Sequence, residues 1–193
     1  MMMPMSDTKV KIIETAVTAF SRHGLRRVSM SDVAEQAHIS RQTLYAHYKN
    51  KDELFLAAME AAYASSLVDL KAAWGKAKNL SDVIDAYYEI AVFRPFEIMR
   101  EHPDLKDLLR GASDQTAHMA KRVEAEKSAL VGAQIAPYGA HLAALNSTPL
   151  AVGEYVVRTS SQLKFTTDDL DELKRYLNTL KSAVLAMTGQ PAS

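Results

Sequence analysis

Apolar residues recur every three or four positions along most of this chain, which is the period of an α-helix rather than of a β-strand. Residues 8–23 carry one clear apolar face, made of Val10, Ile13, Val17 and Phe20. Gly24 follows, and glycine is common just beyond the end of a helix. Strand signals are essentially absent, so the sequence predicts an all-α fold.

Capping residues, glycines and prolines divide the rest of the chain into further helices. Thr166 or Thr167 suits the N-cap of the last helix, whose first turn is rich in acids. Pro95 should kink or end its helix, because proline lacks a backbone N–H and its ring clashes with the preceding turn. After the first helix, the predicted helices are two short ones within residues 29–48, then 51–74, one from residue 81, 104–110, 113–134, 149–164 and one from residue 168.

The most informative stretch is residues 29–53, which predicts two short helices, a tight turn between them, and a third helix directly afterwards. Ser29 has Asp32 three positions on, as in a capping box, and Ser40 can cap the next helix. In that helix Leu44 and Tyr48 lie four residues apart and can face the core. Five of its other positions carry hydrogen-bond donors: Arg41, Gln42, Thr43, Tyr45 and His47. Such a helix suits the major groove of DNA.

We therefore predict a DNA-binding role for ten residues: Ser29, His38, Ser40, Arg41, Gln42, Thr43, Tyr45, His47, Lys49 and Lys51. Arg41 can pair with a guanine edge and Gln42 with an adenine edge. Phosphate contacts are expected from Tyr45, His47, Lys49 and Lys51, and from Ser29 at a helix N-terminus. The alternative is a solvated helix face with an incidental basic cluster.

The segment from about residue 10 to residue 54 resembles the DNA-binding domain of the TetR (tetracycline-repressor) family of transcriptional regulators. The matching motifs, in order, are Arg22-His23-Gly24, Ser29-Met30, Asp32-Val33-Ala34, Thr43-Leu44-Tyr45 and Lys51 to Leu54. The family usually has glycine where this chain has His38. That position often has a left-handed backbone, which glycine adopts freely and histidine tolerates less well.

The resemblance implies a helix-turn-helix DNA-binding domain over residues 1–52 and a larger helical domain for effector binding and dimerisation over residues 53–193. It implies a homodimeric repressor that binds a near-palindromic operator and is released by a small organic effector. Three alternatives stay open: a DNA-binding regulator without an effector, a regulator controlled by a protein partner, and an enzyme.

The charge distribution agrees with a DNA-binding N-terminal part. Residues 1–51 hold eight Lys and Arg and four acids, a net charge of +4, whereas residues 52–193 hold fifteen and nineteen, a net charge of −4. This polarity indicates one part that meets phosphates and one that does not.

Other function classes have little support in the sequence. The chain has no cysteine, and it lacks metal-ligand spacings and a Gly-rich phosphate loop. We therefore predict no enzymatic activity, no metal and no cofactor. The sequence shows no signal peptide and no apolar run of membrane-spanning length, so we expect a cytoplasmic protein that does not contact a membrane.

An effector site is predicted in the middle of the chain, where aromatic and methionine side chains gather with a few polar groups. The candidates are Trp74, Tyr87, Tyr88, Phe93, Arg94, Phe96, Met99, His102, His118 and Met119. An inward-pointing Arg94 could pair with an anionic effector, whereas an exposed Arg94 would exclude that role. The alternative is that these are ordinary core residues.

The last helix has a narrow apolar seam with a 3-4-3-4 spacing, typical of helices that pack side by side. We interpret it, together with the preceding helix, either as packing within one chain or as a subunit interface; the resemblance favours the interface. The interface candidates are Leu150, Tyr155, Val157, Leu170, Leu173, Leu177, Leu180 and Val184.

Overall fold

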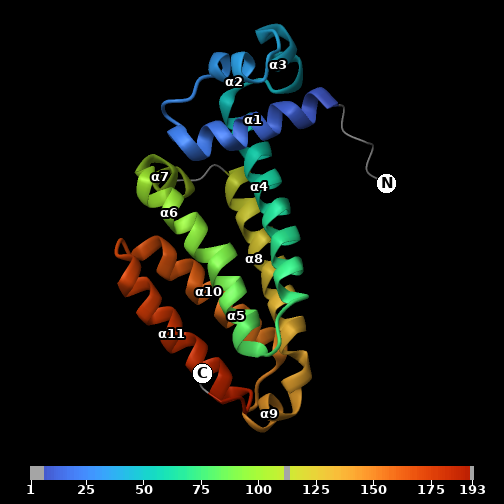
Figure 1. The fold of residues 1–193 in the computed structure, drawn as a ribbon, viewed down its shortest axis with the longest axis vertical. Coiled ribbons are helices and arrows are strands. Elements are labelled where there is room, and N and C mark those ends of the chain that lie inside the picture. Colours follow the sequence, from blue (N-terminus) through green and yellow to red (C-terminus); the bar gives the residue numbers. More distant parts are fainter. Residues whose placement is uncertain (1–6, 111–113, 192–193) are drawn as a thin grey trace. The chain divides into compact units, whose positions relative to one another are not determined.

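The computed structural model describes residues 7–110 and 114–191, and every regular element in those ranges is helical (Figure 1). This confirms the predicted all-α fold. The chain forms two compact units. We call the first, Met1–Ser66 with Ile98–Ala112, the head unit, and the second, Leu67–Glu97 with Ser113–Ser193, the body unit. No helix among the described residues is both long and apolar enough to cross a membrane.

The head unit begins with three helices and the first part of a fourth: α1 (Asp7–His23), α2 (Met30–Gln36), α3 (Arg41–His47) and α4 (Lys51–Trp74). Their apolar faces share one core, in which Ile12, Val33, Leu44 and Leu54 are fully buried. Each helix supplies at least one of these side chains. Burial against the others therefore stabilises α2 and α3, which have seven residues each and would be too short to persist alone.

The middle of the chain continues as α5 (Leu80–Tyr88), a π-helical segment (Glu89–Phe93), α6 (Arg94–Glu101) and α7 (Pro103–Arg110). The sequence predicted that Pro95 kinks or ends its helix, and the helical run continues through Pro95 without ending. Instead the preceding turn widens, and the Arg94 N–H donates to the Glu89 carbonyl, five residues back. We interpret the π-helical segment as the local solution to Pro95, since a wider turn relieves the crowding that proline imposes on an α-helix.

The C-terminal half contains α8 (Asp114–Ile135), a 3₁₀ turn (Ala136–Tyr138), α9 (Gly139–Ala144), α10 (Pro149–Thr166) and α11 (Leu170–Met187). The predicted start of α8 at Ser113 lies outside the described residues. The predicted cap of α11 at Thr166 or Thr167 is wrong, because the Asp169 carboxylate accepts the Glu172 N–H at 2.8 Å. Thr167 is instead the C-cap of α10.

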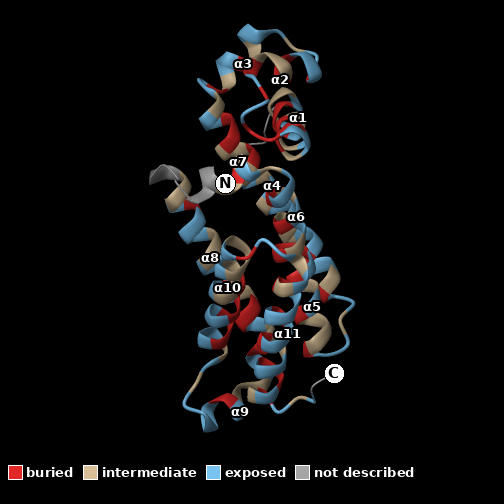
Figure 2. Cartoon of the chain, turned by 90° about the vertical axis from the view of Figure 1, so that its left-hand side faces the viewer, coloured by how far each residue is buried: buried red, intermediate tan, exposed pale blue. Residues whose placement is uncertain are grey.

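The apolar seam of α11 packs inside the body unit. Leu173, Leu177 and Val184 have no exposed surface and Leu180 has 6%. They pack in one core with buried residues of α5 and α10, and Figure 2 shows the buried positions in red. A side chain that is fully buried within one chain has no surface left for a second chain. The seam therefore stabilises the protomer.

Helices α8 and α10 cross at two glycines, which bring their backbones together. A Cβ on Gly153 would lie 2.5 Å from the Ser128 carbonyl oxygen and 2.7 Å from the Gly132 backbone nitrogen. Only glycine at residue 153 permits this approach, so α8 and α10 form a closely packed pair.

Two half-buried lysines on this pair of helices have lowered pKa values. Burial, together with the smaller effect of the neighbouring charge of Lys127 on α8, lowers the pKa of Lys164 on α10 to about 7. Burial also lowers the pKa of Lys127 to about 8. The Lys164 ammonium lies 5.4 Å from the centre of the Phe165 ring, a favourable cation–π contact.

Lys164 should make the protein more stable as the pH rises from about 7 towards 10.5. The unfolded chain keeps the Lys164 proton throughout this window and the folded chain releases it near pH 7, so the unfolded state binds more protons. Urea unfolding at pH 7 and pH 9.5 should show a gain of at most about 1.4 kcal/mol per pH unit in the wild type. Lys164→Met should reduce the gain. Lys174→Met, at an exposed lysine of α11, is the control, and equal gains in both variants would contradict the expectation.

Candidate nucleic-acid interface

Helix α3 is capped at its start and buried along one face. At its start, the Ser40 hydroxyl accepts the Thr43 N–H at 3.0 Å and lies 2.8 Å from the Thr43 hydroxyl. Beneath it, Leu44 has no exposed surface and Tyr48 has 4%. Both were predicted as core residues, and the structure places them there. The caps and the buried face leave the opposite face of α3 turned towards solvent in a single orientation.

The exposed face of α3 carries the side chains predicted to contact DNA. Arg41, Gln42 and Tyr45 are exposed, whereas Thr43 and His47 are partly buried. Arg41 and Gln42 follow the N-cap directly and lie in the first turn of α3. Side chains in the first turn of a recognition helix are those that reach base edges when such a helix enters the major groove.

The turn between α2 and α3 has a left-handed residue at His38, whose φ is 51°. The His38 N–H donates to the Glu35 carbonyl at 2.9 Å, and the Ile39 N–H donates to the Ala34 carbonyl at 3.0 Å. These two bonds form a Schellman motif, which ends α2 and normally places glycine at the left-handed position. His38 therefore adopts the backbone that its neighbours require, at an energetic cost that glycine would avoid.

Ser29 serves mainly as the cap of α2. Its hydroxyl accepts the Asp32 N–H at 3.2 Å, and the Asp32 carboxylate accepts the Ser29 N–H at 2.8 Å. The capping box expected from the sequence is therefore present. The Ser29 N–H and hydroxyl together hold the pKa of the Asp32 carboxyl below its ordinary value.

Lys49 and Lys51 differ in their surroundings, although both were predicted to contact phosphate. Lys49 is exposed at the start of α4, where its N–H donates to the Glu53 carboxylate at 2.9 Å. The Lys51 ammonium donates to the Leu25 carbonyl at 2.9 Å and to the Val28 carbonyl at 3.2 Å. Two of its three protons are thus used inside the protein. The structure favours a positioning role for Lys51 over the predicted phosphate contact.

The structure does not bring the predicted effector residues together. Five of them pack in the core of the body unit: Trp74, Tyr87, Tyr88, Phe93 and Phe96. Met119 is also buried, whereas His118 is exposed. Met99 and His102 belong to the head unit. The aromatic residues are therefore core residues first, and the ten candidates are divided between the two units.

Arg94 does not point inward. Its side chain is 53% exposed and pairs with the carboxylates of Asp69 at 3.2 Å and Glu89 at 3.5 Å. This excludes the role of buried partner for an anionic effector that the sequence allowed. The acid from α4 could not have been foreseen, because it lies 25 residues earlier in the chain.

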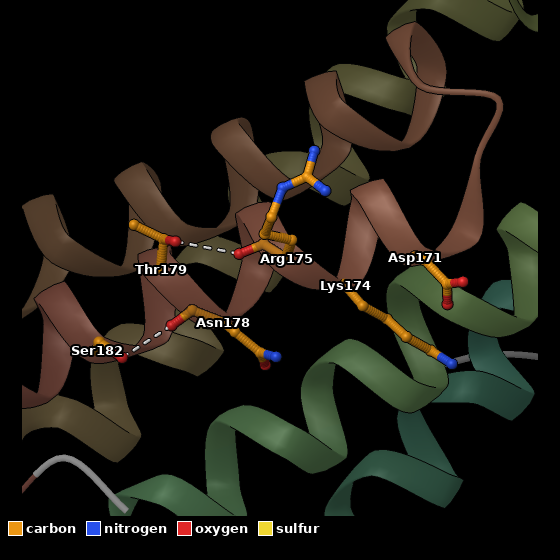
Figure 3. A pocket seen from close by; sticks show the side chains of 6 residues that line it. All are labelled: Asp171, Lys174, Arg175, Asn178, Thr179 and Ser182. Atoms are coloured by element: carbon orange, nitrogen blue, oxygen red, sulfur yellow. Dashed lines mark hydrogen bonds between the residues drawn. The ribbon is translucent and has the colours of Figure 1, made fainter.

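A shallow, open hollow lies on the exposed face of α11 (Figure 3). Its lining residues are Asp171, Lys174, Arg175, Asn178, Thr179 and Ser182. The Thr179 and Ser182 hydroxyls donate to carbonyls of their own helix, those of Arg175 and Asn178. These hydroxyls are therefore already used, and none of the predicted effector residues lines the hollow.

The residues predicted for a subunit interface fall into two groups. Leu173, Leu177, Leu180, Val184 and Val157 are buried within the protomer, and Leu170 is partly buried. Leu150 and Tyr155, by contrast, are 50% and 54% exposed on α10. The buried residues therefore pack inside the protomer and do not form the predicted subunit interface. A heptad-like spacing indicates a buried face, but the residues that cover this face can belong to the same chain or to another.

Comparison with known proteins agrees with this geometry. The family profile described as "Bacterial regulatory proteins, tetR family" matches residues 12–58, which include α2, α3 and the start of α4. Residues 12–58 of this chain are therefore similar to the DNA-binding segment of the tetR family. The chain's all-helical architecture and its N-terminal helix-turn-helix are those expected from the family resemblance.

The curated relatives match over part of the chain. The probable acrEF/envCD operon repressor of Escherichia coli strain K12 is 38% identical over 48 residues, which are 25% of this chain and 22% of that protein. An HTH-type transcriptional repressor of Streptomyces coelicolor is 42% identical over 53 residues, 28% of each chain. The match thus spans about a quarter of the length of these relatives.

Similarity of fold extends over nearly the whole chain. The crystal structure of a transcriptional regulator from Cytophaga hutchinsonii covers 95% of this chain and 96% of its own, with a TM-score of 0.69 and 15% identity. At that identity the match shows a common fold. The helices that follow the matched segment therefore have an architecture shared with solved structures.

Replacing His38 by glycine should stabilise the head. Glycine removes the left-handed strain, and the net gain should be about 0.5–1 kcal/mol in the free energy of unfolding. Asn146→Gly is the matched control, because Asn146 also has a φ of 51° and asparagine tolerates this backbone better. Chemical denaturation of both variants measures the difference. An equal or larger gain for Asn146→Gly would contradict strain at His38.

Proposed function

We propose that this protein is a transcriptional repressor that binds a near-palindromic operator as a homodimer and is released by a small organic effector. The single observation that supports DNA binding best is the exposed first turn of α3. Arg41 and Gln42 project from a helix that Ser40 caps and Leu44 anchors. Both side chains suit base edges in the major groove, and a rigid helix presents them in a fixed geometry.

The head provides positive charge beside these base-reading side chains. Arg26, Arg27 and Lys49 are exposed in the head unit, on the loop before α2 and at the start of α4. Phosphate contacts from such groups supply most of the non-specific affinity for DNA and make it depend on salt. In a dimer the two recognition helices would need a separation of about 34–36 Å to enter successive major grooves.

The experiment that tests this function is selection of random duplex DNA on the purified protein at moderate salt, followed by sequencing of the retained DNA. Enrichment of a two-fold symmetric site would support a specific dimeric regulator. Retention without enrichment would leave non-specific binding, and absence of retention would contradict the proposal.

Replacing Gln42 by alanine should relax sequence preference. On the selected duplex the loss should be about 1–3 kcal/mol, whereas binding to a random duplex should stay nearly unchanged, because Gln42 is assigned to a base edge. Lys49→Ala should instead weaken binding to both duplexes and reduce the slope of log K against log salt by about one. Fluorescence anisotropy over a salt series measures both quantities. Equal losses on the two duplexes for Gln42→Ala would remove its base-reading role.

The exposed side of α10 is the surface that best supports the proposed homodimer. Leu150 and Tyr155 are large apolar side chains with about half of their surface in solvent. The neighbouring helix α8 has small exposed residues, Ala125 and Ala129, and is held against α10 by the glycine crossing and by the Arg158–Glu124 hydrogen bond of 2.8 Å. Two closely packed helices with exposed apolar groups suit a second copy of the same pair, as in a four-helix bundle.

Tyr155→Glu should convert the dimer to a monomer, because it would bury a carboxylate in an apolar interface. Tyr176→Glu on α11 is the matched control, since Tyr176 is 45% exposed and undergoes the same substitution. Sedimentation velocity of the wild type and of both variants gives the result. A Tyr155→Glu protein that remains dimeric, or a Tyr176→Glu protein that dissociates, would move the interface away from α10.

Effector binding is supported by one unsatisfied group in the body core. The Tyr88 side chain is 2% exposed, and its hydroxyl makes no hydrogen bond with any described residue. A buried hydroxyl without a partner destabilises the fold, and a polar atom of a bound molecule would relieve this. Tyr88 directly precedes the π-helical segment, and such segments are frequent at functional sites. A small organic molecule with a hydrogen-bonding group is therefore the proposed effector.

A further inference from the structure

The loop between α1 and α2 is held by a residue from a distant part of the chain. The Arg26 N–H donates to the Asp104 carboxylate at 2.9 Å, across 78 residues of sequence. Asp104 lies in the first turn of α7 and belongs with Arg26 to the head unit. The next residue, Leu105, is 7% exposed and packs in the head core. Asp104 is thus brought to the loop by a buried anchor beside it.

The same loop is held from its other side by Lys51. Its ammonium donates to the carbonyls of Leu25 and Val28, which flank Arg26. Leu25 and Val28 are buried, at 7% and 3% exposure. One carboxylate therefore accepts a hydrogen bond from a loop N–H, and one ammonium donates hydrogen bonds to two loop carbonyls. Charged partners make stronger hydrogen bonds to backbone than neutral partners do.

Gly24 shows how closely Asp104 approaches the loop. Its φ is +75°, and a Cβ at this residue would lie 2.9 Å and 3.2 Å from the two Asp104 carboxylate oxygens. The same Cβ would lie 3.2 Å from Nδ1 of His102, whose Nε2 is buried and makes no hydrogen bond with the described residues. The start of α7 therefore packs directly against the backbone of Gly24, which has no side chain.

We infer that Asp104 is a positioning residue of the DNA interface: it fixes the 24–28 loop, and through it α2 and α3, in the geometry that binds DNA. The loop ends at Ser29, the cap of α2, so the position of the loop sets where α2 begins. Helix α2 in turn packs against α3 in the shared head core. The inference rests on the proposed function, because it assigns Asp104 a role in the DNA binding proposed for α3.

The test compares Asp104→Ala, Asp104→Asn and Glu101→Ala in the full-length protein, with the duplex enriched from the random pool as the probe. Glu101 is an exposed acid at the end of α6, so its loss changes the net charge by the same amount. Asp104→Ala should weaken binding about tenfold, which corresponds to about 1.4 kcal/mol. Asp104→Asn keeps an oxygen acceptor and should restore binding to within about twofold of the wild type. Glu101→Ala should bind like the wild type.

Two readouts separate positioning from a general loss of structure. The salt slope should be the same for Asp104→Ala as for the wild type, since no phosphate contact is removed. Amide hydrogen exchange measured by NMR should show loss of protection at Arg26 in Asp104→Ala, whereas the Gly24 amide, bonded to the Phe20 carbonyl at 3.0 Å, should stay protected.

A second variant approaches the same contact from the loop. Gly24→Ala places a methyl group against the Asp104 carboxylate and should also weaken DNA binding. Because both changes disturb one contact, the loss in the double variant should be smaller than the product of the two single losses. A double variant with fully multiplicative losses would argue against a shared contact.

The outcomes distinguish this inference from the proposed function. Wild-type protein that retains no DNA would overturn the proposed function. Wild type that binds while Asp104→Ala binds equally well would overturn only the role of Asp104. Asp104→Asn as weak as Asp104→Ala would overturn the hydrogen-bond mechanism, because an acceptor would then be present without effect.

Discussion

Burial of one side of α3 is the interaction on which the candidate interface depends. A seven-residue helix is too short to be stable in isolation, because helix nucleation is unfavourable and few hydrogen bonds follow it. Leu44 and Tyr48 supply the missing free energy by packing among α1, α2 and α4. Along most of α3, the side chains of the polar face are therefore not needed for packing. This separation allows the exposed residues to be chosen for what they bind.

The backbone between these helices is fixed by a small number of caps and hydrogen bonds. Each short helix begins at a serine whose hydroxyl accepts an N–H of the first turn. Helix α2 ends in a Schellman motif even though the left-handed residue is His38. The loop before α2 is bonded to Lys51 and Asp104 through main-chain atoms only. Such bonds place few restrictions on the loop side chains, so exposed Arg26 and Arg27 remain available to solvent.

The sequence predicted the head well because its signals are local. Caps, turns and apolar spacings act over three to five residues, so Ser29, Ser40 and Leu44 could each be assigned from their neighbours. Contacts between distant residues could not be assigned in this way. The roles of Lys51 and Arg94 depend on carbonyls or acids more than 20 residues away. The α11 seam shows a related limit, since its spacing indicates a buried face but does not identify the helix that covers it.

The π-helical segment has a consequence for the register of the helix that follows it. A π turn closes with one more residue than an α turn, so residues 89–93 hold one residue in excess of a regular helix. Each residue in an α-helix advances the direction of the side chains by about 100°. If the segment regularised without loss of a residue, every side chain of α6 would turn by about that angle. Deleting one residue from this segment would instead leave α6 facing as it does now, with an unbroken α-helix from α5.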